Sequence, residues 1–198
     1  MSEMKKNVKS IIILIAVLAL FYFTSPFLFG GSFVPENFIA ARQRGAVIAK
    51  DIVQLTGDSL ANLDEISAQD RQYNFGKALS LVHGELDQAK KSRLKAIKLT
   101  EELDRMARAA SGIKPTKARN LVMEAVGNEV SLISHLIVYN DILNGLLQTL
   151  DYKFSGDIRY DVEDVQNLIK SMNKEAKEIN NLNGIFNQKM GEFDELVK

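Results

Sequence analysis

Few residues in this chain have the types and spacing that catalysis or metal binding requires. There is no cysteine, which excludes disulfides, thiolate metal sites and a lipid-modified cysteine. The phosphate-binding patterns GxGxxG and GxxxxGK[ST], the zinc pattern HExxH and the nucleophile pattern GxSxG are also missing. A carboxylate di-iron bundle needs glutamate three residues before histidine, but Ser80 precedes His83 and Leu132 precedes His135 at that spacing. We therefore expect no enzyme activity, cofactor or metal site, and two histidines partly exposed on helix flanks.

The most distinctive polar residues are Glu129 and Asn183, which interrupt apolar rows of helical period. If the chain reverses near residues 68, 113 and 156, Glu129 comes level with Asn183 on one side and with Lys98 on the other. With the reversal near residue 68, Arg42 lies at about the same level along the bundle as Glu129. Because a buried carboxylate needs a partner, the sequence predicts an internal polar layer of Glu129, Asn183 and a basic group from Lys98 or Arg42.

Two interpretations of this layer stay open. A polar residue in an apolar seam fixes the register and orientation of neighbouring helices, as a single buried asparagine does in coiled coils. The same groups would alternatively line a pocket for a ligand or an ion. Replacing Glu129 with leucine separates the two, because a structural layer tolerates the change and a site loses binding.

A second candidate feature is a run of positive charge between residues 90 and 98. Lys90, Lys91, Arg93, Lys95 and Lys98 place five positive charges in nine residues with no acidic residue among them. Most such runs are solvated helix faces. The helical period allows Arg93 and Lys98 to turn inward while Lys91 and Lys95 face out, and a patch for an anionic lipid or polymer is the functional alternative.

The elements that must position these residues are helices. Apolar residues recur at steps of three and four from Phe38 to Val197, with no sustained alternation, which predicts four long helices and no sheet. The first helix opens at Pro35 and bends near Gly57, with a helix end there as the alternative, and the second opens at the capping pair Ser67 and Asp70.

The remaining boundaries follow from glycine and proline. The second helix ends at Ala110, where Gly112 suits the left-handed residue after a helix and Pro115 suits the start of the third. Gly156 ends the third helix and Asp157 caps the fourth. Short connections between long helices favour an antiparallel up-down-up-down bundle.

Residues 10–31 form the expected transmembrane anchor. The nineteen-residue run from Ile11 to Phe29 carries no charge and would measure roughly 28 Å as a helix, close to the hydrocarbon thickness of a bilayer. Lys5, Lys6 and Lys9 precede it, so the positive-inside rule places residues 1–9 in the cytoplasm and residues 32–198 outside. A signal peptide cleaved before Phe33 is the alternative.

Composition bounds the function of the outer domain. Without residues 1–9 the chain holds 22 basic and 24 acidic residues, which is not the basic footprint of a nucleic-acid-binding protein. The leading hypothesis is a single-pass, membrane-anchored binding or scaffolding module that acts through protein–protein contacts with a partner whose identity the sequence does not give. A homo-oligomer is one open alternative for that partner. The alternative is an extracytoplasmic sensor of a small ligand or ion that uses the buried polar layer.

Overall fold

The computed structural model describes residues 33–198. The cytoplasmic tail and the transmembrane anchor expected at residues 1–31 lie outside the described residues. The described part is all-helical, as the sequence predicts, with one isolated β-bridge between Phe33 and Lys114.

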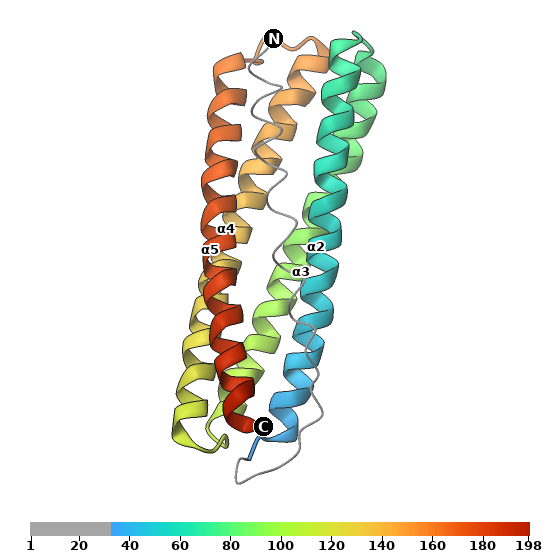
Figure 1. The fold of residues 1–198 in the computed structure, drawn as a ribbon. Coiled ribbons are helices and arrows are strands. Elements are labelled where there is room, and N and C mark those ends of the chain that lie inside the picture. The colour runs from blue at the N-terminus through green and yellow to red at the C-terminus, as the bar shows by residue number, and fades with distance from the viewer. Residues whose placement is uncertain (1–32) are drawn as a thin grey trace.

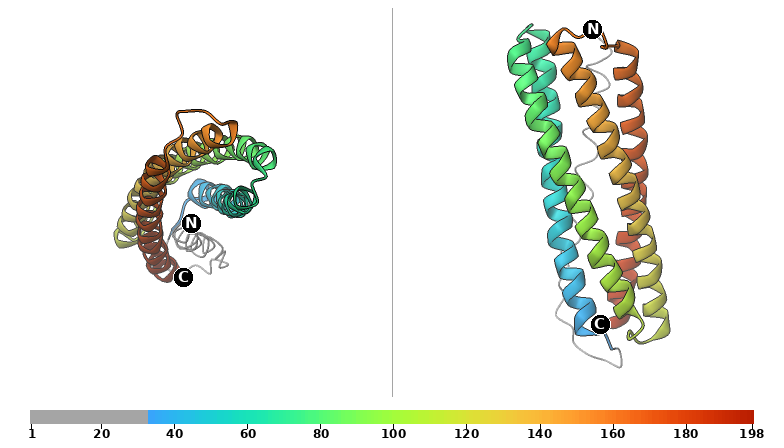
Figure 2. Two further views of the ribbon diagram at one scale, coloured as in Figure 1. Left: turned by 90° about the horizontal axis from the view of Figure 1, so that it is seen from above. Right: turned by 180° about the vertical axis from the view of Figure 1, so that it is seen from behind.

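Four long helices run alternately up and down (Figure 1). They are α2 (Glu36–Arg71), α3 (Phe75–Ala110), α4 (Thr116–Ser155) and α5 (Val162–Val197). Each packs on the next along the chain, α2 on α3, α3 on α4 and α4 on α5. The view from above in Figure 2 shows these helices as a curved row. Short connections force this order, since they leave each helix beside its sequence neighbour.

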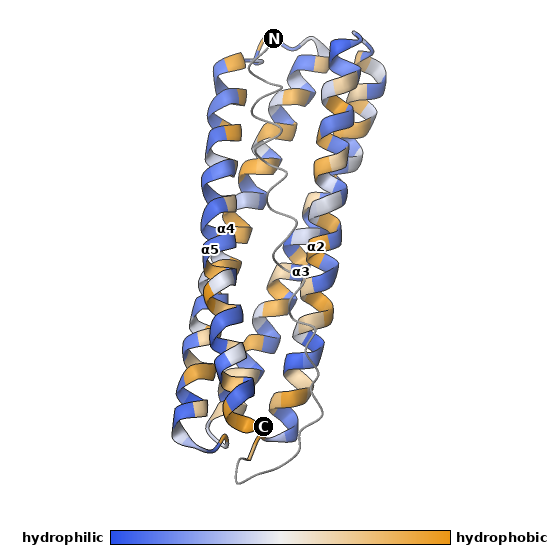
Figure 3. Cartoon of the chain, viewed as in Figure 1, coloured by the Kyte–Doolittle hydropathy of each residue, from blue (hydrophilic) through white to orange (hydrophobic). Residues whose placement is uncertain are grey.

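The helices bury the rows that their period predicts. In α5 every third or fourth residue is buried from Val165 to Val197. Figure 3 shows this as hydrophobic residues recurring along α5 between hydrophilic stretches. Each fully buried large apolar side chain contributes about 1.5–3 kcal/mol, so these rows hold the helices together. The row does not extend back to Ile158, which lies before the helix and is fully exposed.

Two predicted helix starts are wrong for the same reason, that a residue suited to capping is used elsewhere. Ser67 and Asp70 lie inside α2, where the Ser67 hydroxyl accepts a hydrogen bond from Arg71 and Asp70 forms a 2.6 Å ion pair with Lys153 of α4. Asp157 bonds Arg159, and the cap of α5 is Asp161, whose carboxylate accepts from the N–H of Glu163 at 2.8 Å.

The two glycines at helix ends have different roles. Gly156 is left-handed, with φ of 70°, as predicted for the residue after a helix. Gly112 does not adopt the predicted left-handed conformation. A Cβ on Gly112 would instead come within 2.8 Å of the Pro35 ring, so the close approach of the chain before α2 requires glycine there.

The start of α2 and the end of α5 meet at one end of the bundle (Figure 1). Phe38 and Phe193 form an edge-to-face pair with ring centroids 5.7 Å apart. Arg42 forms two hydrogen bonds with Asp194, of 2.6 and 2.8 Å. These contacts connect the first and last described helices, and they place Phe33 at the same end as Lys198.

Within residues 33–198, α4 alone is long and apolar enough to cross a membrane by length and composition. It carries the longest buried row in the bundle, from Ala118 to Phe154. A helix buried between two others passes the same test, and α4 packs between α3 and α5.

Candidate functional site

Glu129 of α4 is the most unusual polar group in the described chain. Its side chain is fully buried, and neither carboxyl oxygen has a hydrogen-bond partner within residues 33–198. Burial raises the pKa of Glu129 to about 8, because a weakly polar interior disfavours the charged form. At neutral pH the group is therefore mainly a neutral carboxylic acid inside an apolar bundle.

Asn183 of α5 lies at the same height as Glu129. Two cross-helix ion pairs bracket these residues, Glu124 with Lys189 at 2.7 Å and His135 with Glu175 at 2.6 Å. Asn183 is also buried, and its carbonyl oxygen accepts a hydrogen bond from the Asn187 amide at 3.3 Å. The structure thus brings both interior polar residues to one level without a hydrogen bond to the Glu129 carboxyl.

The two predicted basic partners do not reach Glu129, which corrects the composition of the layer. Lys98 is exposed, because it lies one residue before Leu99 and so points about 100° away from the buried row of α3. Arg42 is committed to Asp194. No positive charge from either residue offsets the burial of Glu129, and desolvation alone accounts for its shifted pKa.

A second interior carboxyl, Glu85 of α3, has the partners that Glu129 lacks. The Ser59 hydroxyl donates to one oxygen of Glu85, and the Asn62 amide of α2 donates to the other at 2.7 Å. Burial raises the pKa of Glu85, and these two hydrogen bonds oppose the rise. Burial also raises the pKa of Tyr139 on α4, with the charge of Glu85 adding to the effect.

Sequence reasoning missed the Glu85 cluster, although a signal was present. Glu85 lies three residues after Val82 and four before Ala89, which is a seam position in the buried row of α3. Its partners Ser59 and Asn62 lie three residues apart on α2, so they share a face. Only the packing of α2 on α3 shows that they meet Glu85.

The positive run on α3 is largely matched by acidic residues. Lys90 pairs with Asp87 at 3.1 Å, Arg93 with Asp141 of α4 at 3.5 Å, and Lys95 with Asp51 of α2 at 2.5 Å. Lys91 is exposed, as is Arg93, which the sequence placed inward. Two of these pairs cross from α3 to a neighbouring helix and one lies within α3, so acidic side chains interrupt the positive run and it is not a continuous basic patch.

The histidines take part in similar pairs. His83 lies 2.8 Å from Asp151, and His135 lies 2.6 Å from Glu175, each across a helix interface. Within residues 33–198 there is no group of three or more histidine, aspartate and glutamate side chains arranged to hold a metal.

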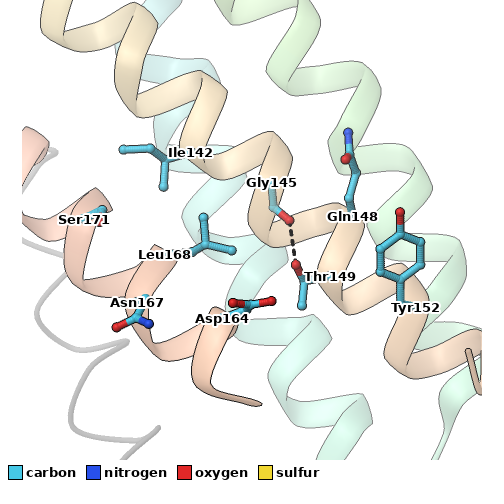
Figure 4. A pocket seen from close by; sticks show the side chains of 9 residues that line it. All are labelled: Ile142, Gly145, Gln148, Thr149, Tyr152, Asp164, Asn167, Leu168 and Ser171. Carbon is cyan, nitrogen blue, oxygen red and sulfur yellow. Dashed lines mark hydrogen bonds between the residues drawn. The ribbon is translucent and has the colours of Figure 1, made fainter. Parts of the chain in front are cut away.

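A shallow cleft of about 470 Å³ separates α4 from α5 near the Gly156 turn. Figure 4 shows Leu168, Asp164 and Thr149 converging between the helices, with Gln148 and Tyr152 further out along α4. The Thr149 hydroxyl donates to the Gly145 carbonyl at 3.0 Å. No basic side chain lines this cleft, so its chemistry does not favour an anion.

The outward side of α4 differs from an ordinary solvated helix face. Between Glu124 and Asp141, its exposed residues are all uncharged, and we call them the α4 outer face: Gly127, Val130, Ser131, Ser134 and Val138. Val130 and Val138 are 42% and 45% exposed. By contrast, α5 exposes Lys170, Lys174 and Lys177 within two turns. An uncharged strip of this length is typical of a surface that a partner covers.

Comparison of the chain with protein-family models, curated proteins and solved structures finds no significant match. Any function assigned to this chain must therefore be argued from its own sequence and geometry.

Proposed function

We propose that this chain is a membrane-anchored helical-bundle module on the extracytoplasmic face, which binds a protein partner through an α-helix packed on the α4 outer face. The uncharged strip from Gly127 to Val138 is the observation that carries the proposal. It runs along one helix, and a second helix is the element whose shape matches such a strip.

The chemistry of the strip supports helix packing. Gly127, Ser131 and Ser134 have small side chains, which allow a second helix axis to come close. The Ser131 hydroxyl donates to the Gly127 carbonyl and the Ser134 hydroxyl to the Val130 carbonyl, each at 3.1 Å. Both hydroxyl protons are therefore already bonded, and covering the strip leaves no donor unsatisfied.

The anchor at residues 10–31 supports the location. It would join the bundle at the end where α2 begins and α5 ends, so the α4 outer face would stand parallel to the bundle axis and clear of the bilayer. A reporter enzyme that works only outside the cytoplasm should therefore be active when it is fused after Lys198. A cytoplasmic reporter would contradict this orientation.

Binding is tested by a photo-crosslinking amino acid introduced at Val130 of the full chain in the producing cells. We expect discrete crosslinked bands from position 130 and none from a matched exposed position on α5, Lys177. Absence of any band specific to position 130 would refute the binding function.

The unpartnered carboxyl of Glu129 favours a second candidate, a sensor of a small ion. A buried carboxylate with no counter-charge gains most from a cation above pH 8, where it is ionised. Thermal unfolding of the full chain at pH 9 should then shift upward with sodium, potassium, magnesium or calcium, and the shift should vanish in Glu129→Gln. Equal melting temperatures in all four salts would eliminate this candidate.

A further inference from the structure

We propose that a pocket lined by three arginines, at the end of the bundle where α2 begins, binds the phosphate of an anionic phospholipid from the membrane that holds the anchor. The inference rests on the proposed anchor at residues 10–31 and goes beyond the binding role of the α4 outer face. The position, the lining and the charge of this pocket carry it.

The pocket lies between α2 and α3 and has a volume of about 310 Å³. Its lining residues are Asn37, Ala40 and Arg44 from α2 and Arg105 and Arg108 from α3. Within each helix they are three or four residues apart, so they share a face. No acidic side chain is among these lining residues. An anion that enters the pocket therefore meets guanidinium groups directly.

The arginines keep hydrogen-bonding capacity and positive charge for a ligand. Arg44 pairs with one oxygen of Glu102 at 2.9 Å, and Arg105 lies 3.8 Å from the other oxygen, beyond hydrogen-bond distance. Arg108 pairs with Asp104 at 2.9 Å. Two carboxylates thus face three guanidinium groups, each of which has five donors in a planar fork that matches phosphate oxygens.

The other charged residues around this end do not cancel that excess. Glu36 and Glu101 are exposed and lie outside the lining of the pocket. Lys114 and Lys117, in the α3–α4 connection and the first turn of α4, are exposed at the same end and add two positive charges.

The pocket is near the membrane because the chain that leaves the proposed anchor is fixed at this end. Phe33, two residues after the anchor, pairs with Lys114 through two backbone hydrogen bonds of 2.9 and 3.2 Å. Arg44 is eight residues into α2 and Arg105 is five residues from the end of α3, so both lie within about 12 Å of this end. Headgroups extend about 5–7 Å beyond the hydrocarbon, and long arginine side chains can bend toward them.

An arginine further along the same helix provides a matched control. Arg93 is 48% exposed and pairs with Asp141 at 3.5 Å. It lies seventeen residues before Ala110, about 25 Å along α3 from the end of that helix, so it is too far from the membrane to reach a headgroup.

The test is a titration of the full chain in dodecyl maltoside with dioleoyl phosphatidylglycerol, with bound lipid counted by native mass spectrometry. The double variant Arg105→Ala, Arg108→Ala should bind the lipid at least tenfold more weakly, whereas Arg93→Ala should bind it as the wild type does. Both replaced side chains are more than half exposed, so the bundle should keep its fold. Equal affinities in the double variant and in Arg93→Ala would overturn the site.

The lysines before the anchor also attract anionic lipids, but they are the same in every variant. The difference between variants therefore reports on the pocket alone.

Two further titrations identify the source of the phosphate. Dioleoyl phosphatidylcholine should not distinguish the wild type from the double variant, because its choline group brings a positive charge to the arginines. Inorganic phosphate at the same concentration should not displace phosphatidylglycerol, because it lacks the acyl chains that hold a headgroup in the micelle. Displacement by inorganic phosphate would assign the pocket to a free anion and overturn the lipid.

Failure of the lipid site and failure of the binding function are distinguishable. Equal lipid binding in all variants would overturn the site and leave the crosslinks from position 130 standing. Absence of those crosslinks would refute the binding function and leave the lipid titration unaffected.

Discussion

At the residue scale, Glu85 and Glu129 show how hydrogen-bond partners determine the free-energy cost of burying a carboxyl group. Glu85 receives hydrogen bonds from Ser59 and Asn62, whereas Glu129 receives none within the described chain. An unsatisfied buried polar group costs about 1–3 kcal/mol, and a satisfied one costs much less. Glu129 therefore lowers the free energy of unfolding of the bundle relative to an apolar residue at the same position.

Glu129→Leu should raise the free energy of unfolding by about 1–3 kcal/mol at pH 4, where the carboxyl holds its proton in both the folded and the unfolded chain, because leucine fills a similar volume without an unpaired polar group. At pH 7 the gain should be larger, because the unfolded chain has lost that proton. Urea denaturation of the full chain in detergent measures the change. A matched variant, Glu85→Leu, should lower stability because it leaves the Ser59 and Asn62 donors unpaired. A loss of stability in Glu129→Leu would show that this carboxyl has a structural partner.

The same residue should make stability depend on pH. The folded chain holds the Glu129 proton up to about pH 8, whereas the unfolded chain releases it near its ordinary value of 4.5. The folded state thus binds more protons between these values, so the free energy of unfolding falls as pH rises through that window and levels off above it. The total loss is up to about 5 kcal/mol.

Glu129→Gln should remove this slope, because glutamine does not titrate. Denaturation midpoints from pH 5 to pH 9 provide the measurement, and Glu101→Gln on an exposed face of α3 provides the control. Identical slopes in wild type and Glu129→Gln would contradict the assignment.

At the element scale, helix ends depend on single side chains whose use the sequence leaves ambiguous. Asp157 and Asp161 are both plausible caps for α5, and only Asp161 bonds the helix backbone. Asp161→Ala should cost about 0.5–2 kcal/mol of stability, the usual loss for an N-cap. Thermal unfolding should show a smaller loss for Asp157→Ala, and the reverse order would contradict the assigned cap.

At the scale of the whole molecule, α2 and α5 meet through Arg42 and Asp194 at the end nearest the expected anchor. Both side chains are less than a fifth exposed, and their two hydrogen bonds connect α2 with α5, the first and last described helices. A double-mutant cycle of Arg42→Ala and Asp194→Ala should give a coupling energy of about 1–2 kcal/mol. A coupling near zero would mean that this pair does not join the two helices.

Much of the fold could be predicted from the sequence. The three–four spacing in α5 is nearly unbroken, so its buried row from Val165 to Val197 follows from period alone. Ala110 and Gly156 are correctly placed because glycine and proline mark these ends locally. Ser67, Asp70 and Asp157 are misplaced because a side chain that caps a helix equally well forms an ion pair with a neighbour, as Asp70 does with Lys153.

The sequence by itself determined the four helices, their buried rows and the level shared by Glu129 and Asn183, because helical period and short connections are local properties of the chain. Only the tertiary structure decided which charges meet. It turned Lys98 outward, gave Arg42 to Asp194, gave Glu85 its two donors and left Glu129 with none. Side-chain partners across helices depend on rotation and offset between them, and a shift of one residue turns a side chain by about 100°.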